Sequence, residues 1–249
     1  MKNFKTTILG VVLAASSFSL SAQQYMPSEN TPVHIRAAVE SSERSAEDSA
    51  RDATRRPAEV LTLADLNEGD HIIELSALGQ YYSTIISAAI DSEGQLDMYD
   101  LPPWSRFGAD ENGNAFADSH ANADYTMEFY HQTSYAENVD AVYNINSYHD
   151  LLPTGVETEQ MNDLLFAALK PGGKYLIIDH RAPDGSDWSD SEELHRIDPA
   201  LVIEEVTAAG FELLTESALL SNPDDDNSTP VFGIEGPSDR LLLIFRKPN

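Results

Sequence analysis

Residues 71–82 constrain the fold of this chain more than any other segment. They begin with the run His71-Ile72-Ile73-Glu74-Leu75, which predicts a buried strand with one carboxylate near its end. Small residues and Gly79, the only glycine of the turn, predict a tight turn before a helical pattern starts at Tyr82. A strand, a tight turn and a helix in this order are typical of the ligand-binding edge of an open α/β sheet.

The rest of the chain alternates between strand and helix patterns. Apolar or alternating runs predict further strands over residues 95–100, 125–130, 139–146, 174–180, 211–216 and 239–246. Helical spacing predicts helices over 58–66, 82–90, 158–169 and 198–209, with Pro57 at a first helical position and Asp198 as a cap. No helix separates the last two strands, so we expect them to be antiparallel neighbours. The pattern predicts an α/β fold with a Rossmann-like, mainly parallel seven-stranded sheet, one antiparallel edge strand, and helices on both faces.

Residues 101–123 interrupt this alternation. They are polar and contain Pro102, Pro103, Gly108 and Gly113. A loop of this length inside a compact domain is usually functional or disordered. We therefore expect a loop here, either a lid over the binding edge or a plain surface excursion.

The N-terminus has the pattern of a secretory signal peptide. Lys2 and Lys5 precede an apolar segment over residues 7–15, and small residues run to Ala22, where we expect cleavage. A membrane anchor is the alternative, but the apolar run is short for a membrane span. The chain has no cysteine, and thus neither a lipid-attachment thiol nor a disulfide. These features predict an exported protein, periplasmic or extracellular, with no membrane contact after signal cleavage.

The sequence divides into three parts. Residues 1–22 are the expected signal peptide, residues 23–55 a leader and an exposed, charged helical arm, and residues 56–249 one α/β domain. The chain contains 15 Lys and Arg residues and 42 Asp and Glu residues, which gives a net charge of −27. Nucleic acid is not an expected partner, because phosphate binding needs a basic face. A small-molecule substrate is expected, and the sequence does not determine an oligomeric state.

Polar side chains follow several of the predicted strands. Ligands of open α/β sheets bind beyond the carboxyl ends of the strands. Glu74 and Gly79 follow the first strand, and Asp100 ends the second, where a carboxylate can accept hydrogen bonds from ribose hydroxyls. The candidates after the fourth and fifth strands and in the next loop are Asn144, Asn146, Tyr148, His149, Asp150, Asp179, His180, His195 and Asp198.

Several short motifs give the chain a resemblance to a known family. They are Arg51-Asp52, Arg55-Arg56-Pro57-Ala58-Glu59-Val60-Leu61, Gly79 with Tyr81-Tyr82, Asn146 with Tyr148-His149-Asp150, Leu169-Lys170-Pro171-Gly172-Gly173, Asp179-His180, His195-Arg196-Ile197-Asp198, Ala209-Gly210-Phe211, and Arg240 with Phe245-Arg246-Lys247-Pro248. Over residues 50–248 the chain resembles the class I S-adenosylmethionine-dependent methyltransferase fold, specifically its exported, predicted-methyltransferase branch. The Leu-Lys-Pro-Gly-Gly turn is typical of the whole fold, and the other motifs are similar to the narrower branch.

The resemblance implies S-adenosylmethionine as the cofactor. The residues implied to line its methionine end are Glu74, Ser76, Gly79 and Tyr81, while Asp100 would take the ribose. Residues after the fourth strand would face the methyl group. His149 is the base candidate, and the polar residues around it are Asn146, Tyr148, Asp150 and His180. The implied function is methyl transfer to a small-molecule or protein acceptor.

Two other functions fit the same residues. A metal-assisted hydrolase would draw its metal ligands from His149, Asp150, His180, His195 and Asp198. No short motif such as H-E-x-x-H supports it. A non-catalytic exported module on a degenerate methyltransferase fold would instead bind a ligand or a protein.

Overall fold

The fold is built on one seven-stranded sheet. The computed structural model describes residues 25–249, so the expected signal peptide lies outside the described residues. The strands are β1 (His71–Leu75), β2 (Gln95–Asp100), β3 (Ala123–Met127), β4 (Val139–Ile145), β5 (Leu169–His180), β6 (Glu212–Glu216) and β7 (Arg240–Arg246). Their order across the sheet is β3-β2-β1-β4-β5-β7-β6.

The sheet has the mainly parallel pairing that the sequence predicts. β1 pairs in parallel with β2 and β4, β2 with β3, and β4 with β5. β7 runs antiparallel to both β5 and β6. The expected antiparallel pair at one edge is thus confirmed, with β7 as the antiparallel strand one place in from β6. The strand order reverses between β1 and β4, and ligands bind such sheets outside the carboxyl ends of the strands at this point.

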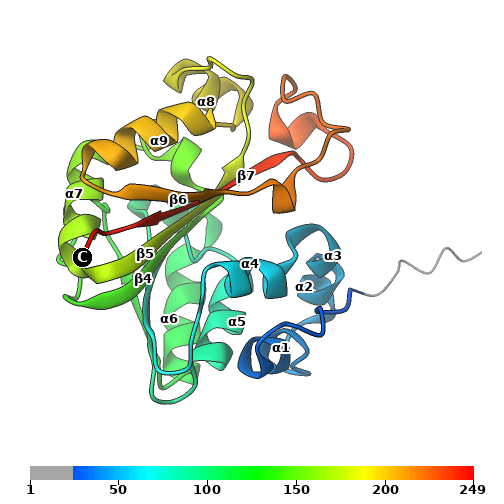
Figure 1. Cartoon of the computed structure of the whole chain (residues 1–249), viewed down its shortest axis with the longest axis vertical. Helices are drawn as coiled ribbons and strands as arrows, with labels where there is room; N and C mark the ends of the chain where they lie inside the picture. The colour runs from blue at the N-terminus through cyan, green and yellow to red at the C-terminus, as the bar shows by residue number, and fades with distance from the viewer. Residues whose placement is uncertain (1–24) are drawn as a thin grey trace, which may run out of the picture.

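Helices cover both faces of the sheet, as predicted (Figure 1). The α-helices are α1 (Val33–Val39), α2 (Ala46–Ala50), α3 (Asp52–Arg55), α4 (Pro57–Leu63), α5 (Tyr81–Ile90), α6 (Ala109–Ser119), α7 (Thr158–Ala168), α8 (Trp188–Leu194) and α9 (Pro199–Ala208). Short 3-10 helices are η1 (Pro102–Phe107), η2 (Tyr148–Asp150), η3 (Ala218–Leu220) and η4 (Val231–Gly233). The apolar faces of α1, α4 and α5 share one core, whereas α7 and α9 pack into the core on the other face.

Residues 101–123 differ from the predicted loop. They form η1 and α6, which bury Trp104 and Phe116, and α6 packs against both η1 and β3. The lid interpretation is therefore wrong for this segment. The sequence hid the helix because Gly113 and its asparagine neighbours are weak helix formers. Gly113 is required by packing, since a Cβ at this position would lie 2.2 Å from the Tyr125 ring.

The N-terminal arm is docked on the domain through α1, so the expectation that it is exposed was wrong for this helix, whereas α2 buries no residue. Ile35, Ala38 and Val39 of α1 are buried against α5 and α4. Arg44 makes two hydrogen bonds of 2.8 and 2.7 Å to the carboxylate of Asp52, and both side chains are almost fully buried. The apolar stripe of α1 has helical spacing, but the helix is only seven residues long. That length gives too few periods to reveal a buried face.

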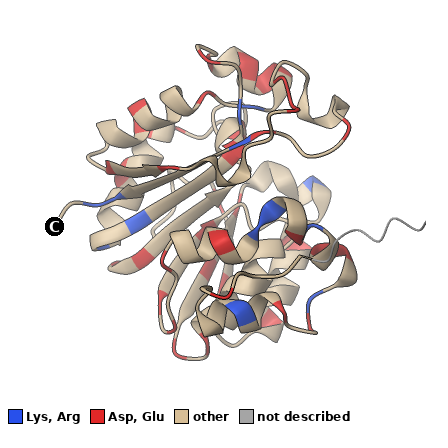
Figure 2. Cartoon of the chain, turned by 45° about the vertical axis from the view of Figure 1, so that its right-hand side comes forward, with Lys and Arg blue, Asp and Glu red and all other residues tan. Residues whose placement is uncertain are grey.

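The negative charge is spread over most elements of the molecule (Figure 2). The arm carries both signs of charge, and its basic residues are Arg36, Arg44, Arg51 and Arg55. Within residues 25–249, no helix combines the length and the apolar character that crossing a membrane requires.

Candidate functional site

The turn after β1 keeps a tight shape although it contains one glycine. Ser76, Gly79 and Gln80 have left-handed backbone, with φ of 69°, 84° and 48°. Outside glycine this conformation costs about 1 kcal/mol or more per residue. The backbone N–H of Ser76 donates to the Tyr99 carbonyl at 2.8 Å and to the Tyr130 hydroxyl at 2.9 Å. These hydrogen bonds hold Ser76 in a conformation that glycine adopts freely.

A cavity of about 170 Å³ lies at the carboxyl end of β1. The turn, α5, β4 and the arm all contribute to its wall. Its lining includes Glu74, Ser76, Gly79, Tyr81, Asn146, Arg51 and Arg55. The structure therefore brings together the residues implied to line the methionine end of the cofactor, and it adds two arginines of the arm.

Three buried polar atoms of this wall have no hydrogen-bond partner within residues 25–249. They are Glu74 Oε2, Arg51 Nε and Asn146 Oδ1. Burial raises the pKa of Glu74 to about 8, and the nearby charge of Asp100 acts in the same direction. An unpaired buried polar group costs about 1–3 kcal/mol, so three of them around one cavity indicate a ligand site.

Arginines of the arm surround the ring of Tyr81. The guanidinium carbons of Arg44, Arg51 and Arg55 lie 5.3, 5.0 and 4.6 Å from the ring centroid. The Tyr81 hydroxyl donates to Asp52 at 2.5 Å, and Arg44 pairs with the same carboxylate. Within residues 25–249 the guanidinium of Arg55 has no hydrogen-bonded partner, and burial lowers its pKa. A cation without a partner is thus available at the cavity.

Asp100 lies at the end of β2, where the sequence predicts it, but its side chain is fully buried. Its Oδ1 accepts a hydrogen bond from Leu78 N at 3.1 Å, and its Oδ2 accepts one from the Tyr125 hydroxyl at 3.2 Å. Burial raises the pKa of Asp100 to about 7. Both oxygens that would accept from ribose hydroxyls are therefore engaged by the turn and by β3.

A second polar group lies at the carboxyl ends of β4 and β5. His149 of η2 and Asp179 of β5 are buried together, with His149 Nδ1 2.7 Å from Asp179 Oδ1. The backbone N–H of His149 donates to Asp179 Oδ2 at 2.8 Å. Burial alone would lower the pKa of His149, but the charge and the hydrogen bond of Asp179 outweigh it and raise the pKa. The pair fixes the imidazole in one orientation.

Asp150 and His195 complete a group with His149. Asp150 Oδ1 lies 3.5 Å from His149 Nε2 and 3.6 Å from His195 Nδ1. One ligand atom of each residue lies within 4.8 Å of the other two. The side chains of Asp150 and His195 are 29% and 37% exposed, so the group opens to solvent.

His180 and Asp198 do not belong to this group, although the sequence offers them as metal ligands. The His180 ring lies 5.7 Å from that of His149, but its Nδ1 is 2.6 Å from Ser238 Oγ, and burial lowers its pKa to about 4. The Asp198 carboxylate caps α9 by accepting from Ala200 N at 2.8 Å. Asp198 is therefore a structural residue, as its capping pattern also predicts.

Tyr148 does not face the binding edge, which corrects its assignment as a catalytic candidate. Its side chain is fully buried, accepts from Asn162 at 3.0 Å and donates to Glu205 at 3.0 Å. The ring lies beside that of Trp188 in the core. Successive residues of the short turn η2 point in different directions, so Tyr148 packs into the core while His149 reaches Asp179.

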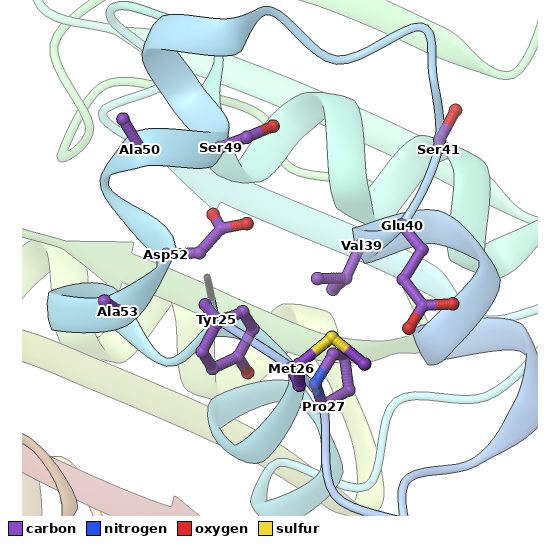
Figure 3. Close-up of a pocket in the computed structure, with 10 residues that line it drawn as sticks. All are labelled: Tyr25, Met26, Pro27, Val39, Glu40, Ser41, Ser49, Ala50, Asp52 and Ala53. Atoms are coloured by element: carbon purple, nitrogen blue, oxygen red, sulfur yellow. The ribbon is translucent and has the colours of Figure 1, made fainter. Parts of the chain in front are cut away.

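A wider cavity of about 600 Å³ lies between the first described residues and the arm (Figure 3). Tyr25, Val39 and Asp52 are among its lining residues, and no histidine lines it. The Asp52 carboxylate is already bonded to Arg44 and Tyr81. This cavity offers fewer groups for chemistry than the carboxyl edge of the sheet.

Comparison with known proteins establishes the fold. The chain is similar to a S-adenosylmethionine-dependent methyltransferase from Aquifex aeolicus, with a TM-score of 0.58, 16% identity, and coverage of 79% of this chain and 92% of that one. It is similar to the N-methyltransferase NodS from Bradyrhizobium japonicum WM9, with a TM-score of 0.56, 16% identity, and coverage of 81% of this chain and 99% of that one. It is also similar to the [4+2]-cyclase SpnF, with a TM-score of 0.56, 18% identity, and coverage of 84% of each chain. No protein-family model matches the sequence, and no curated protein sequence does.

The chain therefore has the class I S-adenosylmethionine-dependent methyltransferase fold. The similarity to a cyclase illustrates that one fold carries different chemistries, so function has to be argued from the site.

Sequence reasoning missed two features of the site. It did not assign Arg51 and Arg55 to the cavity, although both belong to the short motifs that carry the family resemblance. It also did not pair Asp179 with His149. The sequence does contain a signal for that pair. His149 follows the fourth strand and Asp179 ends the fifth, and these two strands are expected to be neighbours in a parallel sheet.

Proposed function

We propose that the chain binds S-adenosylmethionine at the carboxyl end of β1 and transfers its methyl group to a small-molecule acceptor. The observation that carries the proposal is the cavity with the unpartnered atoms of Glu74, Arg51 and Asn146. A buried carboxyl group and nearby guanidinium groups suit the amino and carboxylate groups of an amino acid.

The residues fit the amino-acid end of the cofactor. Glu74 would accept hydrogen bonds from its amino group, and Arg55 would pair with its carboxylate. The ribose would reach Asp100, whose oxygens are bonded to Leu78 and Tyr125. We therefore expect that cofactor binding breaks the hydrogen bond between Leu78 N and the Asp100 carboxylate. Leu78 lies in the turn whose residues Ser76 and Gln80 have left-handed backbone.

When bound, the cofactor supplies an activated methyl carbon. Methyl transfer is an in-line displacement, so the main task of the protein is to align the donor with the acceptor. Glu74 and Arg55 would hold the donor, and the hydrogen bonds of Ser76 fix the turn around it. Since β1, β4 and β5 are consecutive in the sheet, the cofactor cavity and His149 lie at the same edge of the sheet. His149, Asp150 and His195 would therefore face the acceptor.

Calorimetric titration of the chain with S-adenosylmethionine and with its demethylated product tests this proposal. Both compounds contain the same amino-acid end, so both are expected to bind. Arg55→Ala should weaken binding by about tenfold or more, the usual effect of removing a charged hydrogen bond. Arg56→Ala is the matched control, because Arg56 is adjacent but exposed and pairs with Glu59 outside the cavity.

Two outcomes would contradict the proposal. One is the absence of measurable heat with either compound at millimolar concentration. The other is an equal loss of affinity in Arg55→Ala and Arg56→Ala, which would place the ligand elsewhere. Binding of a protein partner without either compound would favour the non-catalytic module.

We also propose that residues 1–22 are removed during export and that the mature chain works in the periplasm or outside the cell. Mass spectrometry of the protein recovered from a cell with an outer membrane should give a mature N-terminus close to Gln23. An intact Met1 on all of the folded protein would contradict export through this route.

A further inference from the structure

We propose that His149, Asp150 and His195 bind one divalent transition-metal ion at the carboxyl ends of β4 and β5. These residues are separate from the cofactor cavity, so the ion site stands independently of the proposed function. A role for the ion in holding an oxygen atom of the acceptor does rest on that function.

The spacing of the three ligand atoms matches that around a metal ion. Asp150 Oδ1 lies 3.5 Å from His149 Nε2 and 3.6 Å from His195 Nδ1. Both distances are too long for an N–H···O hydrogen bond. Tetrahedral bonds of about 2.0–2.1 Å from nitrogen and oxygen to zinc place neighbouring ligand atoms about 3.3 Å apart. A small movement of the half-buried Asp150 and His195 side chains toward each other would close the site around an ion.

The contact between His149 and Asp179 determines which nitrogen of His149 is free. Both oxygens of the Asp179 carboxylate act as acceptors, Oδ2 from the backbone N–H of His149 at 2.8 Å and Oδ1 from the backbone N–H of His180 at 2.7 Å. The His149 Nδ1 must therefore donate to it, and in the neutral ring the lone pair is on Nε2. A histidine ligand that donates its other N–H to a carboxylate is the usual arrangement in metal sites.

Another histidine and carboxylate pair in the chain lacks this arrangement. His71 Nε2 lies 2.7 Å from Asp97 Oδ2, which is an ordinary hydrogen bond and needs no ion. In residues 25–249, only His149, Asp150 and His195 form a group of three ligand-type side chains close enough to share a metal ion.

The ligand set indicates the class of ion. Two imidazole nitrogens and one carboxylate suit zinc, iron(II), manganese or cobalt, whereas magnesium and calcium prefer oxygen ligands. Three protein ligands leave a position open for water or for an oxygen of the acceptor. Phe232, which is 84% exposed, lies with its ring 4.9 Å from that of His195 and gives the open position an apolar neighbour.

Calorimetric titration with zinc chloride, on the full chain after treatment with a chelator, tests the site. We expect one zinc ion per chain, and cobalt(II) in its place should give the visible absorption of a protein-bound ion. His195→Ala and Asp150→Asn change half-buried side chains at the rim of the site and should keep the fold, yet each should lower zinc affinity at least about tenfold. Asp179→Asn should lower it by about 10–100-fold, because Asp179 orients His149.

His71→Ala is the control variant, since it removes a histidine that also pairs with a carboxylate but has no third ligand. Its zinc affinity should equal that of the wild type. Absence of saturable zinc binding to the wild-type chain overturns the proposal, as does an equal loss in His71→Ala and His195→Ala. Zinc binding that persists when S-adenosylmethionine does not bind would support the ion site and remove the proposed function.

Discussion

Two carboxyl groups with raised pKa values lie at the ends of neighbouring strands. Burial raises the pKa of Glu74 to about 8 and that of Asp100 to about 7. Apolar side chains would fill these positions at lower cost, because a buried carboxyl group loses its hydration. Carboxyl groups that titrate near neutral pH in this way are typical of functional sites.

Glu74→Gln is expected to reduce the pH dependence of stability. Folded Glu74 keeps its proton up to about pH 8, whereas the unfolded side chain loses it near 4.5. Between these values the folded state binds more protons than the unfolded state, so stability falls as the pH rises. One such group contributes a slope of about 1.4 kcal/mol per pH unit, which the variant removes. Denaturant unfolding from about pH 5 to pH 8 measures the slope.

Glu212→Gln provides the control, because the Glu212 side chain is 51% exposed on the edge strand β6. Its slope should match that of the wild-type chain. If the slope of stability against pH in Glu74→Gln also matched that of the wild-type chain, Glu74 would be ionised in the folded chain. Its pKa would then not be raised, which would contradict this prediction.

At the scale of elements, a buried ion pair within the arm supports its attachment to the domain. Asp52 accepts two hydrogen bonds from Arg44 and one from the Tyr81 hydroxyl, and it thereby joins the arm to the first turn of α5. The same contacts place Arg51 and Arg55 at the cavity. The arm is thus part of the binding site as well as a cover for α5.

Asp52→Ala should destabilise the chain by about 3–5 kcal/mol, because it leaves the buried charge of Arg44 without a partner. Trypsin should then cleave faster after Arg44, which is buried in the wild-type chain. Arg36→Ala is the control, since Arg36 makes only an exposed hydrogen bond to the Ser28 carbonyl. Its effect should stay within about 0.5 kcal/mol. Equal protease resistance of Asp52→Ala and wild type would contradict this role of the ion pair.

The packing of α6 against β3 gives a second test at this scale. Gly113→Ala gains about 1 kcal/mol of helix propensity, but its Cβ would meet the Tyr125 ring at 2.2 Å. Overpacking costs about 1–3 kcal/mol, so we expect net destabilisation by thermal unfolding. Asn112→Ala on the exposed face of the same helix should be neutral or slightly stabilising. A higher melting temperature for Gly113→Ala would contradict this prediction, because it would mean that Tyr125 and β3 can move away from the added Cβ at little cost.

At the scale of the whole molecule, charge repulsion opposes folding. The net charge is −27, and acidic residues occur on most elements. The screening length falls from about 30 Å at 0.01 M salt to about 3 Å at 1 M. We therefore expect the melting temperature in calorimetry to rise over this range. Sodium and potassium chloride should act alike if screening is the cause, and a fall in melting temperature would contradict it.

Most of the architecture could be predicted from local patterns. Pro57 begins α4, Asp198 caps α9, and the seven strands occur in the expected order. These features depend on residues within one or two turns of each other, so their signals survive in the sequence. The helix α6 in segment 101–123 could not be predicted in this way. It depends on the contact of Gly113 with the later strand β3 and not on the helix propensity of the segment.

The sequence by itself determined the fold class and the edge of the sheet where ligands bind, because alternation and strand-end residues are local properties. Only the tertiary structure decided which side chains meet there. Asp179 orients His149, the turn engages Asp100, and the docked arm brings Arg55 to the cavity. Each of these contacts joins residues from separate elements, and packing of the whole chain sets their distances. The segment at 71–82 thus predicts a binding edge, whereas its chemistry depends on parts of the chain that lie far from it in sequence.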